Sequence, residues 1–318
     1  MTKFQVRKKL RKVCTETKSI TKTLIRQTNV NQGSLRTNIR RASLGLATVT
    51  VLGLTTSQAA SAVAVRTGFN TNTLPANDDG STGLVNTGFT TNFFGVSRNQ
   101  LYVNNNGNVT FDQPLSTFTP FGLTNTQRQI IAPFFADVDT RGSASQPVTY
   151  GTGTVDGRNA FGVNWVNVGY YPSASDKLNS FQLVLVDRSD TGAGNFDIEY
   201  NYDRIQWETG SASSGSNGLG GSSARVGYSN GTGAPGTFFE LPGSAVNGAL
   251  LDGGSNSLVS SRLNSNVNGR YIFTARNGSV SNQPVPEPLT ILGSLAASSF
   301  GIGLRRKYKQ QQKDTANV

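Results

Sequence analysis

Between about residues 66 and 281, the chain consists of short apolar or alternating runs separated by clusters of Gly, Asn, Asp, Ser and Pro. The clearest run is 195–203, in which four apolar residues occupy alternate positions: Phe196, Ile198, Tyr200 and Tyr202. Alternation with period two indicates a strand with one face on a core and the other in water. Because no segment shows a sustained helical period, we predict a single antiparallel all-β domain of the β-sandwich type.

The polar positions of the same run, Asp197 and Glu199, are expected to form a solvated strand face. Ile205 and Trp207 then resume the apolar pattern in the opposite phase. A slip of one residue turns every following side chain to the other face of a sheet, so we expect a bulge or turn near 203–204.

Two further segments define the predicted sheets. Residues 101–111 fit a hairpin whose three-residue loop, 105–107, ends on a glycine in the left-handed conformation, and this register pairs Val103 with Val109. The nearly continuous apolar run 181–187 predicts a central strand covered on both faces. The remaining strand candidates are 130–135, 161–171, 224–229 and 270–275, and the Gly/Ser-rich stretch 211–223 is expected to be a flexible loop or long turn.

Charge is distributed unevenly along the chain, whose formal net charge is +11. Residues 1–65 hold 12 Lys and Arg and one acid, whereas residues 66–281 hold 12 Lys and Arg and 15 acids. The basic character therefore belongs to the chain ends, where it would orient the protein in a membrane. The mildly acidic middle has no basic stripe, so we expect no nucleic acid as a partner.

The counts of cysteine and histidine restrict the chemistry of the protein. Cys14 is the only cysteine and the sequence has no histidine. A Ser-His-Asp or Cys-His catalytic site and a His-ligated zinc are excluded. An enzyme built on this chain would have to work with carboxylates, Lys, Tyr or backbone groups.

The N-terminal region has the order of a secretory signal peptide. An apolar stretch, 44–54, follows a cluster of arginines, and Ala60-Ser61-Ala62 follows it as a small-residue cleavage site. We therefore expect export by a Sec-type machinery and cleavage by signal peptidase after Ala62. The 43 residues before the apolar stretch exceed the usual length. A non-Met start near Val30 or Leu35 and a long basic leader both remain open.

The C-terminal region carries a second targeting pattern. The triplet Pro286-Glu287-Pro288 is followed by the apolar stretch 289–304 and then by Arg305 and Arg306. At 16 residues the stretch is shorter than the roughly 20 that span a bilayer core. The order resembles the PEP-CTERM sorting signal of Gram-negative bacteria that make extracellular polysaccharide; the alternative is an ordinary membrane anchor. The resemblance implies a transmembrane tether in the inner membrane, later removed by an exosortase-like transpeptidase, and a final place at the cell surface or in the extracellular matrix.

The strand-forming region resembles the NIDO (nidogen-like extracellular) domain from about Leu84 to Ala275. The matching motifs are Tyr102-Val103-Asn104, Asn106-Gly107, Ala132-Pro133-Phe134, Asp137, Asp139, Trp165, Val168, Phe181-Gln182, Gln206-Trp207 and Gly210. The resemblance implies an extracellular-matrix or cell-adhesion role without enzymatic activity. The partner it implies is an extracellular polysaccharide or a matrix protein.

These patterns predict a linear organisation. Its parts are a signal peptide with a long basic n-region (1–62), an exported N-terminal segment (63–83), the NIDO-like domain (84–276), a linker (277–285), the sorting signal (286–309) and a cytoplasmic polar tail (310–318).

Within the domain, Asp137 and Asp139 are the candidate metal ligands. Two residues apart at a strand end, they could point to one face and bind Ca²⁺, which takes six to eight oxygen ligands. Asp78, Asp79, the 104–106 loop or backbone carbonyls could supply the rest. The alternative is a turn with solvated or turn-capping carboxylates.

Aromatic residues are the other candidates for ligand contact. Tyr170 and Tyr171 end a strand in a loop and could touch a ligand at the surface, whereas Trp165 is expected in the core. We expect a non-catalytic surface or matrix module acting in adhesion or in biofilm and exopolysaccharide association. The alternatives are a carboxylate-based glycosidase acting on matrix polysaccharide and a Ca²⁺-stabilised structural protein.

Overall fold

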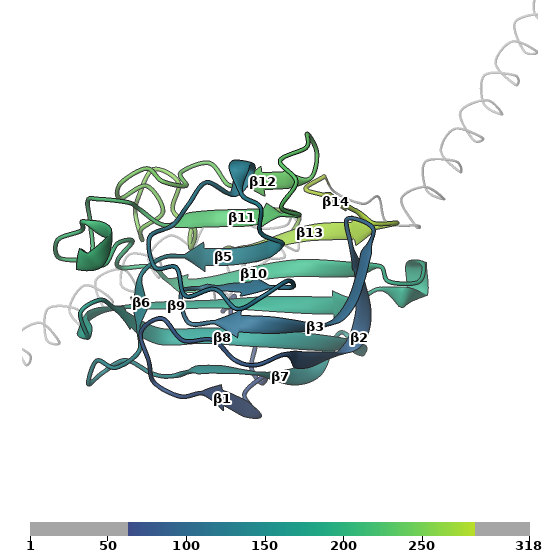
Figure 1. Ribbon diagram of the computed structural model, residues 1–318, viewed down its shortest axis with the longest axis horizontal. Coiled ribbons are helices and arrows are strands. Elements are labelled where there is room, and N and C mark those ends of the chain that lie inside the picture. The colour runs from purple at the N-terminus through teal and green to yellow at the C-terminus, as the bar shows by residue number, and fades with distance from the viewer. Residues whose placement is uncertain (1–62, 284–318) are drawn as a thin grey trace, which may run out of the picture. The chain divides into compact units, whose positions relative to one another are not determined.

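The computed structural model describes residues 63–283, which form two antiparallel sheets lying one over the other (Figure 1). The larger sheet has the order β1-β7-β8-β9-β10-β13-β14, with β6 paired to β8, and the smaller has the order β12-β11-β5-β4-β3-β2. The predicted all-β sandwich is therefore confirmed. No helix within these residues is long and apolar enough to cross a membrane. The predicted signal peptide and sorting tail lie outside the described residues.

The strands have the following bounds. They are β1 Asn72–Leu74, β2 Val85–Phe93, β3 Val96–Asn104, β4 Asn108–Thr110, β5 Ile130–Phe135, β6 Val138–Asp139, β7 Val148–Val155, β8 Arg158–Tyr170, β9 Ala174–Asp187, β10 Phe196–Arg204, β11 Arg225–Ser229, β12 Phe238–Glu240, β13 Arg270–Arg276 and β14 Ser279–Ser281. Three single turns of 3₁₀ helix lie between them, at Leu123–Asn125 (η1), Ser189–Thr191 (η2) and Ser211–Ser213 (η3).

Aromatic side chains fill the space between the sheets. The rings of Trp165 and Phe181 stack with centroids 5.3 Å apart, and Phe134 meets Trp207 edge to face at 5.8 Å. Both indoles are fully buried, which confirms the core placement of Trp165. Each indole N–H finds a backbone carbonyl, as burial of a polar group requires.

The strand register follows the sequence pattern closely. β9 lies between β8 and β10 with residues 181–186 all buried, as expected for a central strand. The β3–β4 hairpin has the predicted loop, with Val103 opposite Val109 and Gly107 at φ 71°. The pairing of β10 with β9 shifts between Tyr202 and Arg204, where the change of phase predicted a bulge.

The prediction of a solvated face on β10 is wrong for Glu199, which is only 3 % exposed. Its carboxylate lies 2.6 Å from the Arg66 guanidinium and 3.3 Å from that of Arg270. The N-terminal segment covers this outer face of the larger sheet, with Phe69 packed against Val184 and its neighbours. Pairing and hydrogen bonding offset the cost of burying the charge.

The sheets also extend beyond the interval 84–276. β1 comes from the preceding segment and pairs with β7, whereas β14 comes from residues expected to form a linker and pairs with β13. The Gly/Ser-rich stretch 211–223 has no regular strand, but its backbone is tied together, for example by Ser222 N–H donating to the carbonyl of Ser213 at 2.9 Å.

Candidate cation site

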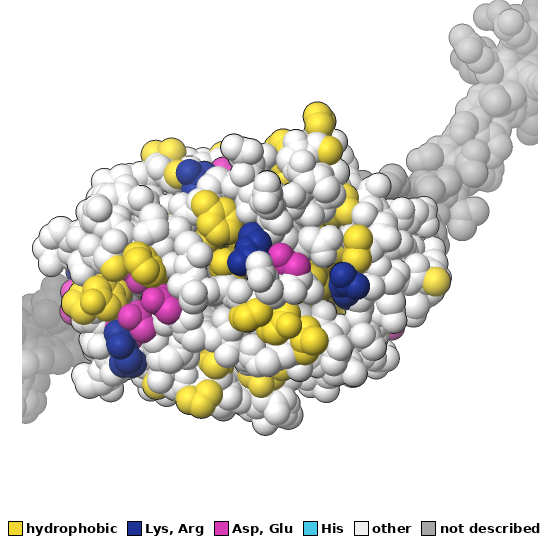
Figure 2. Space-filling model, viewed as in Figure 1, with side chains coloured by type: hydrophobic (Ala, Val, Ile, Leu, Met, Phe, Trp, Pro, Cys, Tyr) yellow, Lys and Arg dark blue, Asp and Glu magenta, His cyan; other side chains and the backbone are white. Residues whose placement is uncertain are grey.

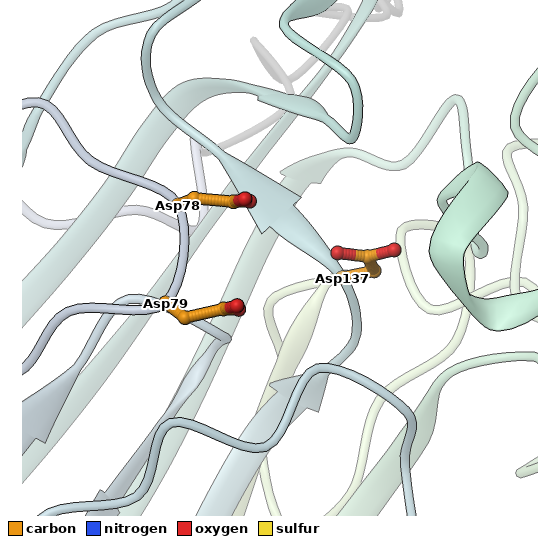
Figure 3. Close-up of side chains that lie close together, drawn as sticks. All are labelled: Asp78, Asp79 and Asp137. Carbon is orange, nitrogen blue, oxygen red and sulfur yellow. The ribbon is translucent and has the colours of Figure 1, made fainter.

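A cluster of carboxylates lies at one end of the sandwich, where three separate segments of the chain meet (Figure 3). Asp78 and Asp79 belong to the turn after β1, and Asp137 lies in the short connection between β5 and β6. One oxygen from each residue can be chosen so that all three lie within 4.8 Å of one another. We refer to these three residues as the acidic cluster.

The strand connections and two backbone contacts explain why these segments meet. β5 and β6 belong to different sheets, so the connection at 136–137 must cross from one sheet to the other. The turn after β1 is fastened to β6 because Asn77 N–H donates to Thr140 Oγ1 at 2.8 Å and Thr140 N–H donates to the Asn77 carbonyl at 2.9 Å.

The β3–β4 loop supports the acidic cluster from a third side. Asn106 Nδ2 donates to Asp79 Oδ1 at 2.8 Å, and its Oδ1 accepts from Val138 N–H at 2.9 Å. Asn105 Nδ2 donates to the carbonyl oxygens of Asp78 and Val138. Both asparagine side chains are fully buried and thus hold the acidic turn in one place.

Two oxygens of the acidic cluster are not satisfied by the described residues. Asp137 is 2 % exposed, and its Oδ2 is buried without a hydrogen-bond partner; the same holds for Asp78 Oδ1. A buried carboxylate oxygen without a donor is costly and calls for a proton, water or ion. Gly210 lies directly against this Asp137 oxygen, because a Cβ there would lie 2.2 Å from Oδ2.

The electrostatics of the acidic cluster disfavour three negative charges. Burial, followed by the charges of Asp78 and Asp79, raises the pKa of Asp137 to about 7. Burial, followed by the charges of Asp139 and Asp79, raises the pKa of Asp78 to about 6. Desolvation and repulsion between like charges both favour the protonated acid, and a bound cation would relieve both.

Asp139, which the sequence pattern pairs with Asp137 as a metal ligand, is not one of the three residues of the acidic cluster. Its carboxylate pairs with Arg141, Nη2 to Oδ2 at 2.7 Å and Nε to Oδ1 at 2.9 Å, and accepts from Ser173 N–H at 2.7 Å. Burial would raise the pKa of Asp139, but these hydrogen bonds outweigh it and hold the pKa below its usual value. The Asp139 carboxylate therefore already has its hydrogen-bond donors. Arg141 also pairs with Asp78, with Nη2 3.0 Å from Oδ2. Figure 2 shows acidic side chains beside a basic one at this end of the molecule.

The donor set fits a hard cation. Carboxylate oxygens are the ligands that Ca²⁺ prefers, whereas structural zinc sites are built from thiolate and imidazole. Asp78, Asp79 and Asp137 would supply three of the six to eight oxygens that Ca²⁺ takes, and water would complete the shell.

The two candidate tyrosines have different environments. Tyr170 is 6 % exposed, its ring lies 5.5 Å from that of Trp207, and its hydroxyl donates to Asp176 at 3.0 Å. Tyr170 is thus part of the core, whereas Tyr171 is partly exposed. The predicted cleavage and sorting residues, Ala60 and Ala62 at one end and Pro286, Glu287, Pro288, Arg305 and Arg306 at the other, lie outside the described residues.

Sequence comparison identifies the family to which this fold belongs. The family described as Nidogen-like domain matches residues 99–156 and 149–277, which together are more than half of the chain. The chain therefore belongs to the nidogen-like domain family.

Three relatives carry this region within much longer chains. Human alpha-tectorin is 36 % identical over an alignment of 223 residues that covers 63 % of this chain and 10 % of the relative; chicken alpha-tectorin is 32 % identical over the same aligned length. Drosophila melanogaster nidogen is 31 % identical over 118 residues, 30 % of this chain and 8 % of the relative. The chain thus matches a tenth or less of the length of these relatives. No solved structure matches it significantly.

Proposed function

We propose that the protein is an exported, non-catalytic module of the cell surface or extracellular matrix, acting in adhesion or in biofilm and exopolysaccharide association. The observation that carries this proposal is membership of the nidogen-like domain family, supported by relatives named alpha-tectorin and nidogen. The bacterial setting and the place outside the cell rest on the two targeting patterns at the chain ends.

Delivery would proceed in two steps. A Sec-type machinery exports the chain and signal peptidase cleaves after Ala62; the apolar tail then tethers the protein in the inner membrane until an exosortase-like transpeptidase acts at Pro286-Glu287-Pro288. Glu287→Ala tests the second step. The variant should stay in the membrane with its tail, whereas normal release of Glu287→Ala would refute the sorting proposal.

A role without catalysis agrees with the arrangement of carboxylates. Two-carboxylate glycosidases place their acids across a cleft, about 5–9.5 Å apart. The groove that the described residues form on the smaller sheet has one carboxylate in its lining, Asp112. The acidic cluster belongs to a different set of segments and is supported by buried asparagines. The glycosidase alternative therefore gains no support from the described residues.

A second role, stabilisation by Ca²⁺, is favoured by the acidic cluster. An ion bound by Asp78, Asp79 and Asp137 would join the turn after β1 to the β5–β6 connection and so fasten the N-terminal segment to the sandwich. The melting temperature should rise with added CaCl₂ relative to EDTA in the wild-type protein, and this rise should vanish in Asp137→Asn. Asp156→Asn, which removes an exposed carboxylate elsewhere, should keep the full response. Equal melting temperatures of the wild type in CaCl₂ and EDTA would refute this role.

The adhesive role itself is tested by association with the matrix. Protein released by an expressing culture should sediment with isolated extracellular matrix and stay in the supernatant when matrix is omitted. Release of the protein into the medium without any retention by matrix would contradict this part of the proposal.

A further inference from the structure

The outer face of the smaller sheet is only partly covered. Residues after β4 fold back over β5, where Leu115 and Leu123 pack against Ile130, Ala132 and Phe135. This cover ends at Phe111 and Asp112, which form one wall of a groove of about 520 Å³ over β3. Leu84 and Thr90, before and within β2, form the opposite wall.

The floor of the groove comes from β3, of which residues 97–100 and Tyr102 line it. Arg98, Gln100 and Tyr102 occupy alternate positions, and Leu101 and Val103, on the opposite phase, are fully buried in the core. Tyr102 is partly exposed in the groove. The strand therefore presents one aromatic ring and two long planar polar groups in a row.

The volume of the groove is in the range of small-molecule sites, about 300–1,000 Å³. Its chemistry combines one aromatic face with the side chains of Arg98, Gln100 and Asp112. Sugar rings offer an apolar C–H face that packs on an aromatic ring, and neighbouring hydroxyls that both donate and accept hydrogen bonds. Guanidinium, amide and carboxylate groups present paired donors or acceptors at the spacing that such hydroxyl pairs require.

The charges in the groove are partly balanced. Asp112 pairs with Arg128 at 3.1 Å, whereas Arg98 is exposed and makes no ion pair with any described residue. The free guanidinium can serve a hydroxyl pair or the carboxylate of an acidic sugar, the latter in bidentate fashion. Figure 2 shows hydrophobic, basic and acidic side chains side by side over this part of the sheet.

Other ligand classes fit less well. A lipid chain needs a deep apolar cavity, and this groove is open with polar side chains along its floor. A nucleic acid needs a basic stripe, and Arg98 is the one basic residue in the lining. A peptide adding a strand would pair with the edge of β2 and would not need the side chains of β3.

From this arrangement we infer that the groove over β3 is a binding site for a polysaccharide chain, with Tyr102 as the stacking platform and Gln100 and Arg98 as hydrogen-bond donors. The inference rests on the proposed matrix role and names its ligand class.

The test is native electrophoresis of the full-length protein in gels containing dextran, a neutral polysaccharide, or alginate, a polyuronate. We expect the mobility, measured against an inert reference protein, to fall at least twofold in one of these gels relative to a plain gel. Tyr102→Ala and Gln100→Ala should restore the plain-gel mobility, and Tyr102→Phe should keep the retardation. If Arg98→Ala loses the retardation in the alginate gel and in that gel alone, the site binds an acidic sugar.

Two control variants show whether loss of any tyrosine or any arginine, outside the groove, would change the retardation. Tyr150→Ala and Arg262→Ala remove a partly exposed tyrosine and an exposed arginine outside the groove, and both should keep the retardation. Retardation that persists in Tyr102→Ala, or that is lost in Tyr150→Ala, would overturn the inference. Unchanged mobility of the wild type in both gels would also overturn it and would favour a strand-adding peptide. Because the gels measure binding in solution, a protein that fails to be exported would refute the proposed function without altering this result.

Discussion

The indole N–H of Trp165 donates a hydrogen bond to the backbone carbonyl of Asn105 at 2.9 Å. Trp165 lies on β8 of the larger sheet, and Asn105 lies in the β3–β4 loop of the smaller one. The same loop places Asn106 against Asp79. The core of the sandwich and the acidic cluster are thus joined through one buried loop.

Replacing Trp165 by Phe should therefore lower stability through a named contact. Phe keeps much of the stacking on Phe181 but removes one of the two donors to the Asn105 carbonyl, which keeps only the Gly107 N–H at 2.8 Å. Losing such a hydrogen bond costs about 0.5–1.5 kcal/mol, and the vacated ring volume adds to this cost. Urea unfolding in EDTA measures the loss; an unchanged free energy of unfolding would show that the hydrogen bond does not stabilise the fold.

Replacing Asp137 or Asp139 by Asn should change the melting temperature in opposite directions. In EDTA at pH 8, Asp139→Asn should lower the melting temperature because it breaks the pair with Arg141 and weakens the contact with Ser173 N–H. Asp137→Asn should raise it, since it removes a buried charge that repels its neighbours. The same direction of change in both variants would contradict the different environments assigned to these two carboxylates.

The acidic cluster also predicts a pH dependence in the absence of divalent cations. Asp137 and Asp78 have raised pKa values, about 7 and about 6, so between about pH 4 and pH 7 the folded protein holds protons that the unfolded chain has released. Stability must then fall as pH rises through this range. Asp139, whose pKa is lowered, acts in the opposite sense, but only below about pH 4.

Urea unfolding in EDTA at pH 4.5, 5.5, 6.5 and 7.5 measures this slope. Asp137→Asn should flatten it, and saturating CaCl₂ should reduce it in the wild type, because a bound cation favours the ionised carboxylates. Stability that rises with pH over this interval in EDTA would contradict the assigned environments of Asp78 and Asp137.

Two glycines in hairpin loops provide a matched pair of substitutions. Gly107 and Gly157 have φ of 71° and 76°, so Ala at either position costs about 1–2 kcal/mol of backbone strain. A Cβ at Gly107 would also lie 1.8 Å from the Phe134 carbonyl oxygen, whereas one at Gly157 meets nothing within 4 Å. Gly157→Ala should fold with a modest loss of stability, and Gly107→Ala should lose several kcal/mol or fail to fold, as circular dichroism and thermal melting would show. Equal losses would contradict the close approach at Gly107.

The sequence predicts strands and register well where one face is buried. The β10 alternation, the β3–β4 loop and the bulge after Tyr202 all follow from side-chain period and loop chemistry. Glu199 shows the limit of this reasoning, because alternation marks the face opposite the core but does not reveal that residues near Phe69 return to cover it. Such covering depends on contacts more than 100 residues apart in sequence.

The candidate cation site illustrates the same limit. Spacing singles out Asp137 and Asp139, with Asp78 and Asp79 named from the sequence among the possible further ligands. Only the fold reveals that Arg141 pairs with Asp139 and that Asp78 and Asp79 lie within reach of Asp137. The Asp-x-Arg spacing of residues 139–141 is a local signal that could have indicated the ion pair. The groove over β3 had no such signal, since its walls come from β2 and from the residues after β4.

The most direct test of the proposed function is fractionation of cells that express the full-length protein, with intact mass measurement of every fraction that contains it. We expect a species outside the cell that begins near Val63 and ends near Pro286. A species that keeps residues 289–318 in the inner membrane would instead show a plain anchor and a periplasmic module, and an uncleaved protein in the cytoplasm would contradict the extracellular role altogether.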